Sequence, residues 1–171
     1  MRIIHTEEII SNIREMCIEA NHMLTPDMQK ALECAVADEK SPIGQKVLGQ
    51  LQDNLQIAQE DTIPICQDTG MACVFVELGT DVHIEGSFEA AIHEGVRRGY
   101  TDGYLRKSIV ADPLRRGNTG DNTPAVLHVR LVEGDRITLT VAPKGFGSEN
   151  MSRLAMLTPA QGLQGVKDFV V

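Results

Sequence analysis

The sequence has no tryptophan and few aromatic residues of any kind. Phenylalanine and tyrosine supply the whole 4% aromatic content, whereas hydrophobic residues together make up 42% of the 171 residues. Aliphatic side chains and seven methionines are therefore expected to fill the core, and the apolar fraction is too high for a disordered chain. The length suits a single domain over residues 1–171, which we expect to be helical over 1–60 and mixed α/β over 61–171.

Positive charge, long hydrophobic runs and paired cysteines are also scarce. The formal net charge is −8, which argues against general nucleic-acid binding, because that function favours a basic face. No apolar run approaches the length of a membrane span, and the amino terminus lacks a signal pattern. The cysteines (Cys17, Cys34, Cys66 and Cys73) show no CxxC spacing, so a disulfide framework is not expected. We therefore predict a protein of the reducing cytoplasm with neither a nucleic-acid nor a membrane partner.

One segment departs from the acidic trend. Residues 97–116 hold six arginines and lysines against two aspartates, a local net charge of +4. Such a segment attracts a small anion locally, or it is simply a solvated charged stretch. Charge alone leaves both interpretations open.

Three helices are expected in the first 60 residues. Apolar residues recur at helical spacing after Thr6, and Thr25-Pro26 and Ser41-Pro42 each provide an N-cap followed by proline at the first helical position. Cys17 and Cys34 lie in or beside the apolar stripes of these helices. Both are predicted to be inert core residues, since free cysteine is readily buried.

Strand-like segments appear only after residue 60. Residues 136–142 alternate apolar side chains with threonines, which is typical of a half-buried strand, and we predict that they pair with residues 125–132 in a hairpin. Helical patterns first and strand patterns later favour an α+β fold, with a helical amino-terminal region followed by mixed β-sheets flanked by helices. The other expected elements are a strand over 71–78, a helix after Ser87, a loop over 111–124, a helix from about Glu149 and a last helix after Thr158-Pro159.

The last predicted helix runs into Phe169-Val170-Val171 without a glycine or asparagine cap. An apolar chain end usually packs on something. We expect a chain cut within a larger fold, and the alternative is a terminus that docks on its own domain.

The segment Cys66-Gln67-Asp68-Thr69-Gly70 is the sharpest local feature. It places a thiol, an amide, a carboxylate and a hydroxyl at successive positions between two apolar runs. A thiolate followed by a tight turn is a reasonable ligand for a soft metal, and the carboxylate two residues later would lie close to it. Asp-Thr-Gly is also an ordinary turn, so this segment alone does not decide the function.

Two further features bear on binding. Glycines in Lys144–Asn150 (KGFGSEN) precede an expected helix start, where free backbone N–H groups can face an anion. The lysine precedes the glycines, so the segment is not a Walker A loop, and the alternative is a plain strand-to-helix connection capped by Ser148. Arg106 could grip a carboxylate with its planar fork, although an arginine after a helix is commonly solvated.

Taken together, these segments resemble the α subunit, or amino-terminal domain, of class I fumarases and L-tartrate dehydratases. The resemblance covers most of residues 60–170, and its specificity comes from the order and spacing of the segments rather than from any one of them. The short helical start before Cys66 is more similar to the two-subunit form. The matching segments are ICQDTG (65–70), YLRK (104–107), DPLRRGNTGDNTPA (112–125) and APKGFGSENMSRLAML (142–157).

This resemblance implies an iron–sulfur hydro-lyase that adds or removes water on a four-carbon dicarboxylate. It implies a [4Fe–4S] cluster held by three cysteines, of which Cys66 matches the first and the other two lie beyond this sequence. Gln67 and Asp68 match catalytic positions at the substrate, and Gln67, Arg106 and Gly147 match substrate-binding positions. It further implies a β-subunit partner and an oligomer, with this chain as a truncated α subunit that is inactive alone.

Two substrate pairs stay open, fumarate/malate and L-tartrate/oxaloacetate. The rival hypothesis from another class is a non-catalytic chain that only assembles with a β subunit. A glycine-loop nucleotide binder is a third and weaker interpretation, because no second nucleotide-binding motif supports the glycines.

Overall fold

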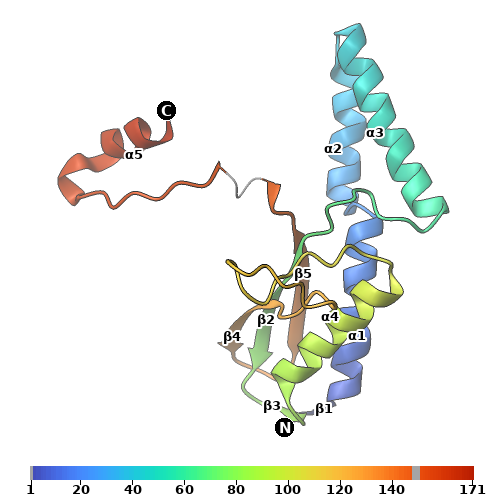
Figure 1. Cartoon of the computed structure of the whole chain (residues 1–171), viewed down its shortest axis with the longest axis vertical. Coiled ribbons are helices and arrows are strands. Elements are labelled where there is room, and N and C mark those ends of the chain that lie inside the picture. Colours follow the sequence, from blue (N-terminus) through green and yellow to red (C-terminus); the bar gives the residue numbers. More distant parts are fainter. Residues whose placement is uncertain (1, 148–150) are drawn as a thin grey trace.

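A computed structural model describes residues 2–147 and 151–171 (Figure 1). The fold is α+β, as the sequence predicts. Its elements are β1 (Arg2–His5), α1 (Thr6–His22), α2 (Pro26–Asp38), α3 (Pro42–Glu60), β2 (Met71–Gly79), β3 (Val82–Glu85), α4 (Phe88–Asp102), β4 (Val126–Val132), β5 (Ile137–Lys144), a short 3₁₀ helix (Pro159–Gln161) and α5 (Gly162–Val170).

The main sheet has the strand order β4-β2-β5, so the predicted hairpin between β4 and β5 is wrong. The central strand β2 runs parallel to β4 and antiparallel to β5. Its apolar side chains suit this central position, where Ala72, Val74 and Val76 are buried. The link between β4 and β5 instead crosses the end of β2, where Gly79 N donates to Arg136 O (2.8 Å) and Asp81 N donates to Gly134 O (2.9 Å). A Cβ atom on Gly79 would lie 2.3 Å from Gly134 O, so glycine is needed for this crossing.

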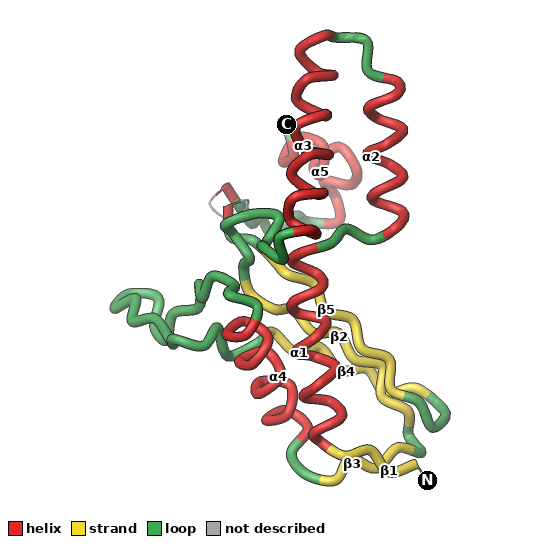
Figure 2. The backbone as a smooth tube through the Cα atoms, turned by 90° about the vertical axis from the view of Figure 1, so that its right-hand side faces the viewer, coloured by secondary structure: helices red, strands yellow, loops and turns green. Residues whose placement is uncertain are grey.

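The core lies between this sheet and the helix pair α1–α4, which covers one face of it (Figures 1 and 2). Ile13, Ile92, Val74, Val96 and Tyr100 are fully buried there. The helix starts follow the sequence signals, since Ser87 Oγ accepts from Ala90 N at the start of α4. The alternating burial of β2 confirms the strand predicted over 71–78. The small parallel pair β1–β3 was not predicted.

Helices α2 and α3 form a hairpin that projects from this body (Figure 2). Both begin at the predicted prolines, and Ser41 Oγ accepts from Gly44 N at the start of α3. None of the thirteen described residues of α2 is buried, because α2 packs mainly on α3. Cys34 is therefore exposed, and its assignment to the core is wrong. Cys17 is fully buried as predicted, and burial raises the pKa of its thiol to about 12.

The carboxyl-terminal segment is extended and leads to α5 (Figure 1). The last helix begins as predicted after Thr158-Pro159, first as a 3₁₀ turn and then as α5. The predicted helix start at Glu149, with Ser148 as its cap, lies outside the described residues. The described stretch 152–158 is not helical, so the helix expected there does not continue through it. Within the described residues, no helix is both long and apolar enough to span a bilayer.

Candidate functional site

The segment Cys66–Gly70 lies in the connection between α3 and β2, and its first half faces solvent. Cys66 and Gln67 are both exposed. Asp68 N donates to Cys66 Sγ at 3.4 Å, and the Cys66 thiol lies 3.8 Å from Gln67 Oε1. The sulfur is thus accessible, and a backbone donor is directed at it.

The second half of the same segment is buried. Tyr100 Oη donates to Thr69 O at 2.8 Å, and Thr69 Oγ1 donates to Arg106 O at 3.1 Å. Burial raises the pKa of the Tyr100 hydroxyl, so it stays protonated and able to donate. Gly70 has a φ of +60°, and a Cβ atom there would lie 2.1 Å from Lys144 O. The turn is therefore locked onto α4, the Arg106 segment and the end of β5.

Asp68 connects the two halves and also reaches the glycine loop. Its Oδ1 accepts from Gly70 N and its Oδ2 accepts from Phe146 N, both at 3.2 Å. These two backbone donors hold the carboxylate in one orientation. They also occupy the N–H of Phe146 in the glycine loop, which makes that group unavailable to a phosphate and weighs against a nucleotide-binding loop.

A cavity of about 690 Å³ opens beside this carboxylate. Its lining includes Asp68, Arg106, Lys107, Arg116 and Phe146. The structure thus brings together Asp68 and Arg106, which are separated by 37 intervening residues in the sequence. Among the described lining residues, three cations stand against one carboxylate, a positive balance that suits an anion carrying more than one negative group. Cys66, Gln67 and Gly147 are not among the described residues that line it. All three are exposed, and each is within two residues of a lining residue in the sequence.

The rest of the basic segment has another role. Arg97 pairs with Glu94 and with Asp121 (Nε to Oδ2, 2.9 Å), whereas Arg98 pairs with Glu94 and with Glu7 (Nη1 to Oε1, 2.7 Å). Burial opposes ionisation of Asp121, but hydrogen bonds from Arg97 and Thr123 outweigh it and lower its pKa to about 2. Arg97 and Arg98 are therefore engaged in ion pairs, whereas Arg106, Lys107 and Arg116 line the cavity.

Asn122 is a residue of this region that the sequence did not single out. It is fully buried, and its Oδ1 accepts from Ser108 N (2.7 Å) and Ile109 N (3.2 Å). Its Nδ2 donates to Gly70 O at 3.0 Å. The sequence predicts a loop over residues 111–124, but an asparagine among many turn-forming residues gives no signal that it is buried.

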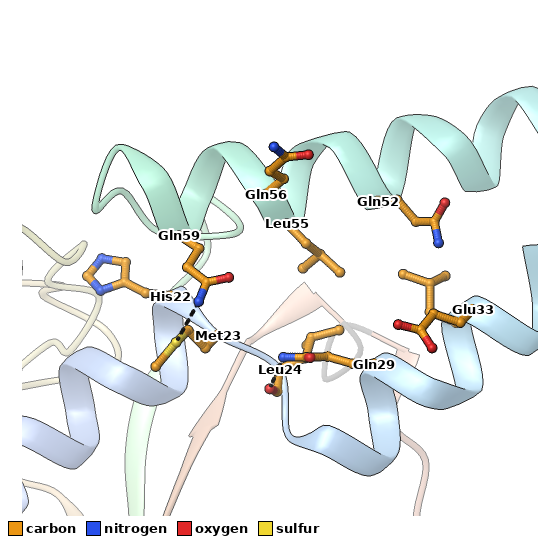
Figure 3. Close-up of a pocket in the computed structure, with 10 residues that line it drawn as sticks. His22, Met23, Leu24, Gln29, Glu33, Gln52, Leu55, Gln56 and Gln59 are labelled. Atoms are coloured by element: carbon orange, nitrogen blue, oxygen red, sulfur yellow. Dashed lines mark hydrogen bonds between the residues drawn. The ribbon is translucent and has the colours of Figure 1, made fainter.

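A second hollow, of about 220 Å³, lies between α2 and α3 (Figure 3). Glutamines line much of it, and Gln59 Nε2 donates to Met23 Sδ at 3.6 Å. His22 lies at one end, and burial lowers its pKa. No residue predicted for catalysis, binding or metal coordination lies in this hollow, so the cavity beside Asp68 is the candidate site.

The described residues contain no group of three or more histidines, cysteines, aspartates or glutamates that could hold a metal. Cys66 is an exposed thiol that fits the role of one ligand, whereas Cys17 is buried with a raised pKa and Cys34 lies on the projecting hairpin. Among these three cysteines, Cys66 is therefore the one whose exposure and position beside Asp68 suit a ligand role.

Comparison with known proteins agrees with the resemblance seen in the sequence. The model of the family described as "Fumarate hydratase (Fumerase)" matches residues 10–171. The chain is 38% identical over 165 residues to a putative L(+)-tartrate dehydratase subunit alpha of Methanocaldococcus jannaschii, covering 92% of this chain and 57% of the relative. It is 33% identical over 161 residues to the anaerobic class I fumarate hydratase of Escherichia coli, covering 90% of this chain and 29% of the relative.

An L(+)-tartrate dehydratase subunit alpha of Escherichia coli is 30% identical over 166 residues, which cover 95% of this chain and 54% of that subunit. The chain thus spans about half the length of the tartrate dehydratase α subunits that it matches. Because the family model matches nearly the whole sequence, this chain belongs to the fumarate hydratase (Fumerase) family.

Proposed function

We propose that this chain is part of the α subunit of a hydro-lyase that reversibly adds or removes water on a four-carbon dicarboxylate. The observation that carries the proposal is the positively charged cavity that Asp68 and Arg106 both line. A dicarboxylate needs a cation to bind it and a titrating group to move a proton, and these two side chains supply one of each.

Arg106 binds one substrate carboxylate in this proposal. Its guanidinium can form two parallel hydrogen bonds to a carboxylate, which fixes orientation as well as charge. Lys107 and Arg116 add positive charge around the same cavity. Gln67 and Gly147, both exposed, complete the substrate contacts from the two loops that flank Asp68.

Asp68 moves the proton that accompanies water addition or loss. Its carboxylate is held by the N–H groups of Gly70 and Phe146, so it meets the substrate in one fixed orientation. Fixed orientation favours proton transfer, because the reacting groups then need no rearrangement. The neighbouring amide of Gln67 is suited to orienting the hydroxyl that leaves or adds.

Cys66 would hold a [4Fe–4S] cluster together with ligands from elsewhere in the enzyme. When bound, such a cluster supplies an open iron that acts as a Lewis acid on the substrate oxygen atoms. The exposure of Cys66 and the backbone donor directed at its sulfur support this role. An exposed thiol of this kind needs a reducing compartment, for which we propose the cytoplasm.

We further propose that the chain works with a β subunit in an oligomer. The names of the tartrate dehydratase relatives identify them as α subunits, and the described residues contain no complete set of metal ligands. The incomplete set of metal ligands among the described residues also favours the second candidate function, a chain that assembles with a β subunit without catalysis. Fumarate/malate and L-tartrate/oxaloacetate are both retained as substrate pairs.

The test is an anaerobic reconstitution of the 171 residues alone and of the complete α chain with its β subunit. Iron and sulfide content, fumarate hydration and L-tartrate dehydration are measured on both. We expect a stoichiometric cluster and turnover of at least one substrate in the assembled enzyme, and neither in the 171 residues alone. An assembled enzyme that acts on neither substrate would overturn the hydro-lyase proposal, and robust turnover by the 171 residues would overturn the need for other ligands.

A further inference from the structure

Asn122 joins the two segments that carry Asp68 and Arg106. The N–H of Gly70 donates to Asp68 Oδ1, and the carbonyl oxygen of Gly70 accepts from Asn122 Nδ2. Ser108 and Ile109, which follow Arg106 by two and three residues, donate their N–H groups to Asn122 Oδ1. One amide side chain therefore holds a turn and an irregular segment that are remote in sequence.

The loop around Asn122 is built to direct this side chain inward. Asn122 itself adopts a φ of +62°, a left-handed conformation that asparagine tolerates better than most residues. Asp121 anchors the preceding position to α4 through Arg97, and Asp121 Oδ1 accepts from Thr123 N (3.0 Å) and Thr123 Oγ1 (2.7 Å). Neighbouring residues thus fix the loop, and the hydrogen bonds of Asn122 tie the Gly70 turn and the Ser108 segment to it.

We propose that Asn122 is a positioning residue that sets the placement of Asp68 relative to Arg106 across the cavity. It is fully buried and does not line the cavity among the described residues, so it acts through its hydrogen bonds and not by touching substrate. The inference rests on the proposed function, in which Asp68 transfers a proton and Arg106 binds a carboxylate. A second link, from Thr69 Oγ1 to Arg106 O, runs between the same two segments.

Two substitutions separate the two ends of this contact. Asn122→Asp keeps an oxygen that can accept from Ser108 and Ile109 but removes the N–H that Gly70 O receives. It releases the turn that carries Asp68, so kcat should fall by on the order of tenfold to a hundredfold with a smaller change in KM. Asn122→Ala releases both segments, so KM should rise as well.

The control is Ile4→Ala. Ile4 is also buried, but it lies on β1, beside the end of β2 opposite to the one that follows Asp68. Both substitutions should lower the melting temperature, because Asn122→Asp removes a donor from Gly70 O and buries a carboxyl group, whereas Ile4→Ala leaves a cavity in the core. Only Asn122→Asp should change kcat in the folded assembled enzyme. An equal change in both variants would reduce Asn122 to a structural residue.

A double-mutant cycle with Asp68→Asn tests the mechanism of the effect. If Asn122 acts through Asp68, the kcat losses of Asn122→Asp and Asp68→Asn are not additive, whereas additive losses contradict the proposal.

Amide hydrogen exchange of the assembled protein is a readout independent of activity. Asn122→Ala should speed exchange at Ser108 and Ile109, whereas Ile4→Ala should leave it unchanged. If the wild-type assembled protein turns over neither substrate but exchange is faster in Asn122→Ala, the proposed function is wrong and the role of the Asn122 contact is still supported. Unchanged exchange in Asn122→Ala would overturn the role of the contact.

Discussion

The two halves of the candidate site differ in what holds them. Thr69 and Gly70 are buried and hydrogen-bonded to the body of the protein, as is Asn122. Cys66 and Gln67, only a few residues earlier, are exposed, and so is Arg106. The first group forms an anchored half and the second an open half. Substitutions in the open half should change chemistry alone, whereas those in the anchored half should also change the free energy of unfolding.

Removing the thiol from the open half should have the largest effect. In the assembled enzyme, Cys66→Ser should abolish stoichiometric iron and activity, because a hydroxyl is a poor replacement for a thiolate ligand. The thermal stability of the metal-free protein should not change. Cys34→Ser is the control, since Cys34 is also exposed but lies on the projecting hairpin. Full iron content in Cys66→Ser would end this assignment.

Removing the charge from Asp68 should lower activity while leaving iron content intact. Asp68→Asn keeps the size of the side chain and removes its titrating group. We expect a loss of on the order of a hundredfold or more in kcat. Asp112→Asn is the matched control, because Asp112 also accepts backbone N–H groups in a turn, those of Leu114 and Arg115, but is not among the residues that line the cavity. A wild-type kcat in Asp68→Asn would show that Asp68 only shapes its turn.

Adding one methyl group to the anchored half should destabilise the protein. Gly70→Ala places a Cβ in a left-handed residue and against Lys144 O, so the free energy of unfolding should fall by at least about 2 kcal/mol. Urea denaturation measures this change. Gly117→Ala is the control, because no atom lies within 4 Å of its Cβ position. Equal stability of the two variants would show that the Gly70 turn is not locked.

Replacing the guanidinium in the open half should weaken substrate binding. Arg106→Lys keeps the charge but loses the planar fork, so kcat/KM of the assembled enzyme should fall by roughly 1–3 kcal/mol in free-energy terms. The loss should appear mainly in KM, and the melting temperature should stay the same. Arg115→Lys provides the comparison, since Arg115 is exposed in the same basic segment and does not line the cavity among the described residues. An unchanged kcat/KM would mean that Arg106 is merely solvated.

The open half, together with Asp68, was easier to predict from the sequence than the anchored half. Cys66, Asp68 and Arg106 carry chemically distinctive groups in recognisable segments. The helix starts at Pro26 and Pro42 follow the proline signals, with a side-chain cap at Ser41 but not at Thr25. The role of Asn122 depends on its hydrogen bond to Gly70, which lies 52 positions away along the chain. Local sequence patterns do not encode such a contact.

The errors in the predicted fold have the same origin. The two strands on either side of Gly134 look like a hairpin locally, but their shared partner is β2, which precedes both in sequence. Cys34 lies beside an apolar stripe, yet burial depends on what packs against the helix, and α2 projects from the body. Propensity and periodicity predict elements well, whereas strand order and burial are set by contacts between distant segments.

The smallest expected effect concerns the ion pair that anchors the loop of the anchored half. The folded-state pKa of Asp121 is about 2, below its ordinary value of 3.8, so its ionised form stabilises the fold. This contribution is fully present above about pH 3.8 and is lost as the pH falls through about 2. Because Arg97 is 46% exposed, solvent screening keeps the contribution to about 1 kcal/mol or less. Urea denaturation of wild type and Asp121→Asn should show a difference at pH 7 that shrinks between pH 4 and pH 2 and is unaffected between pH 5 and pH 7. A difference that is constant down to pH 2 would show that packing of Asp121, and not its charge, anchors the loop.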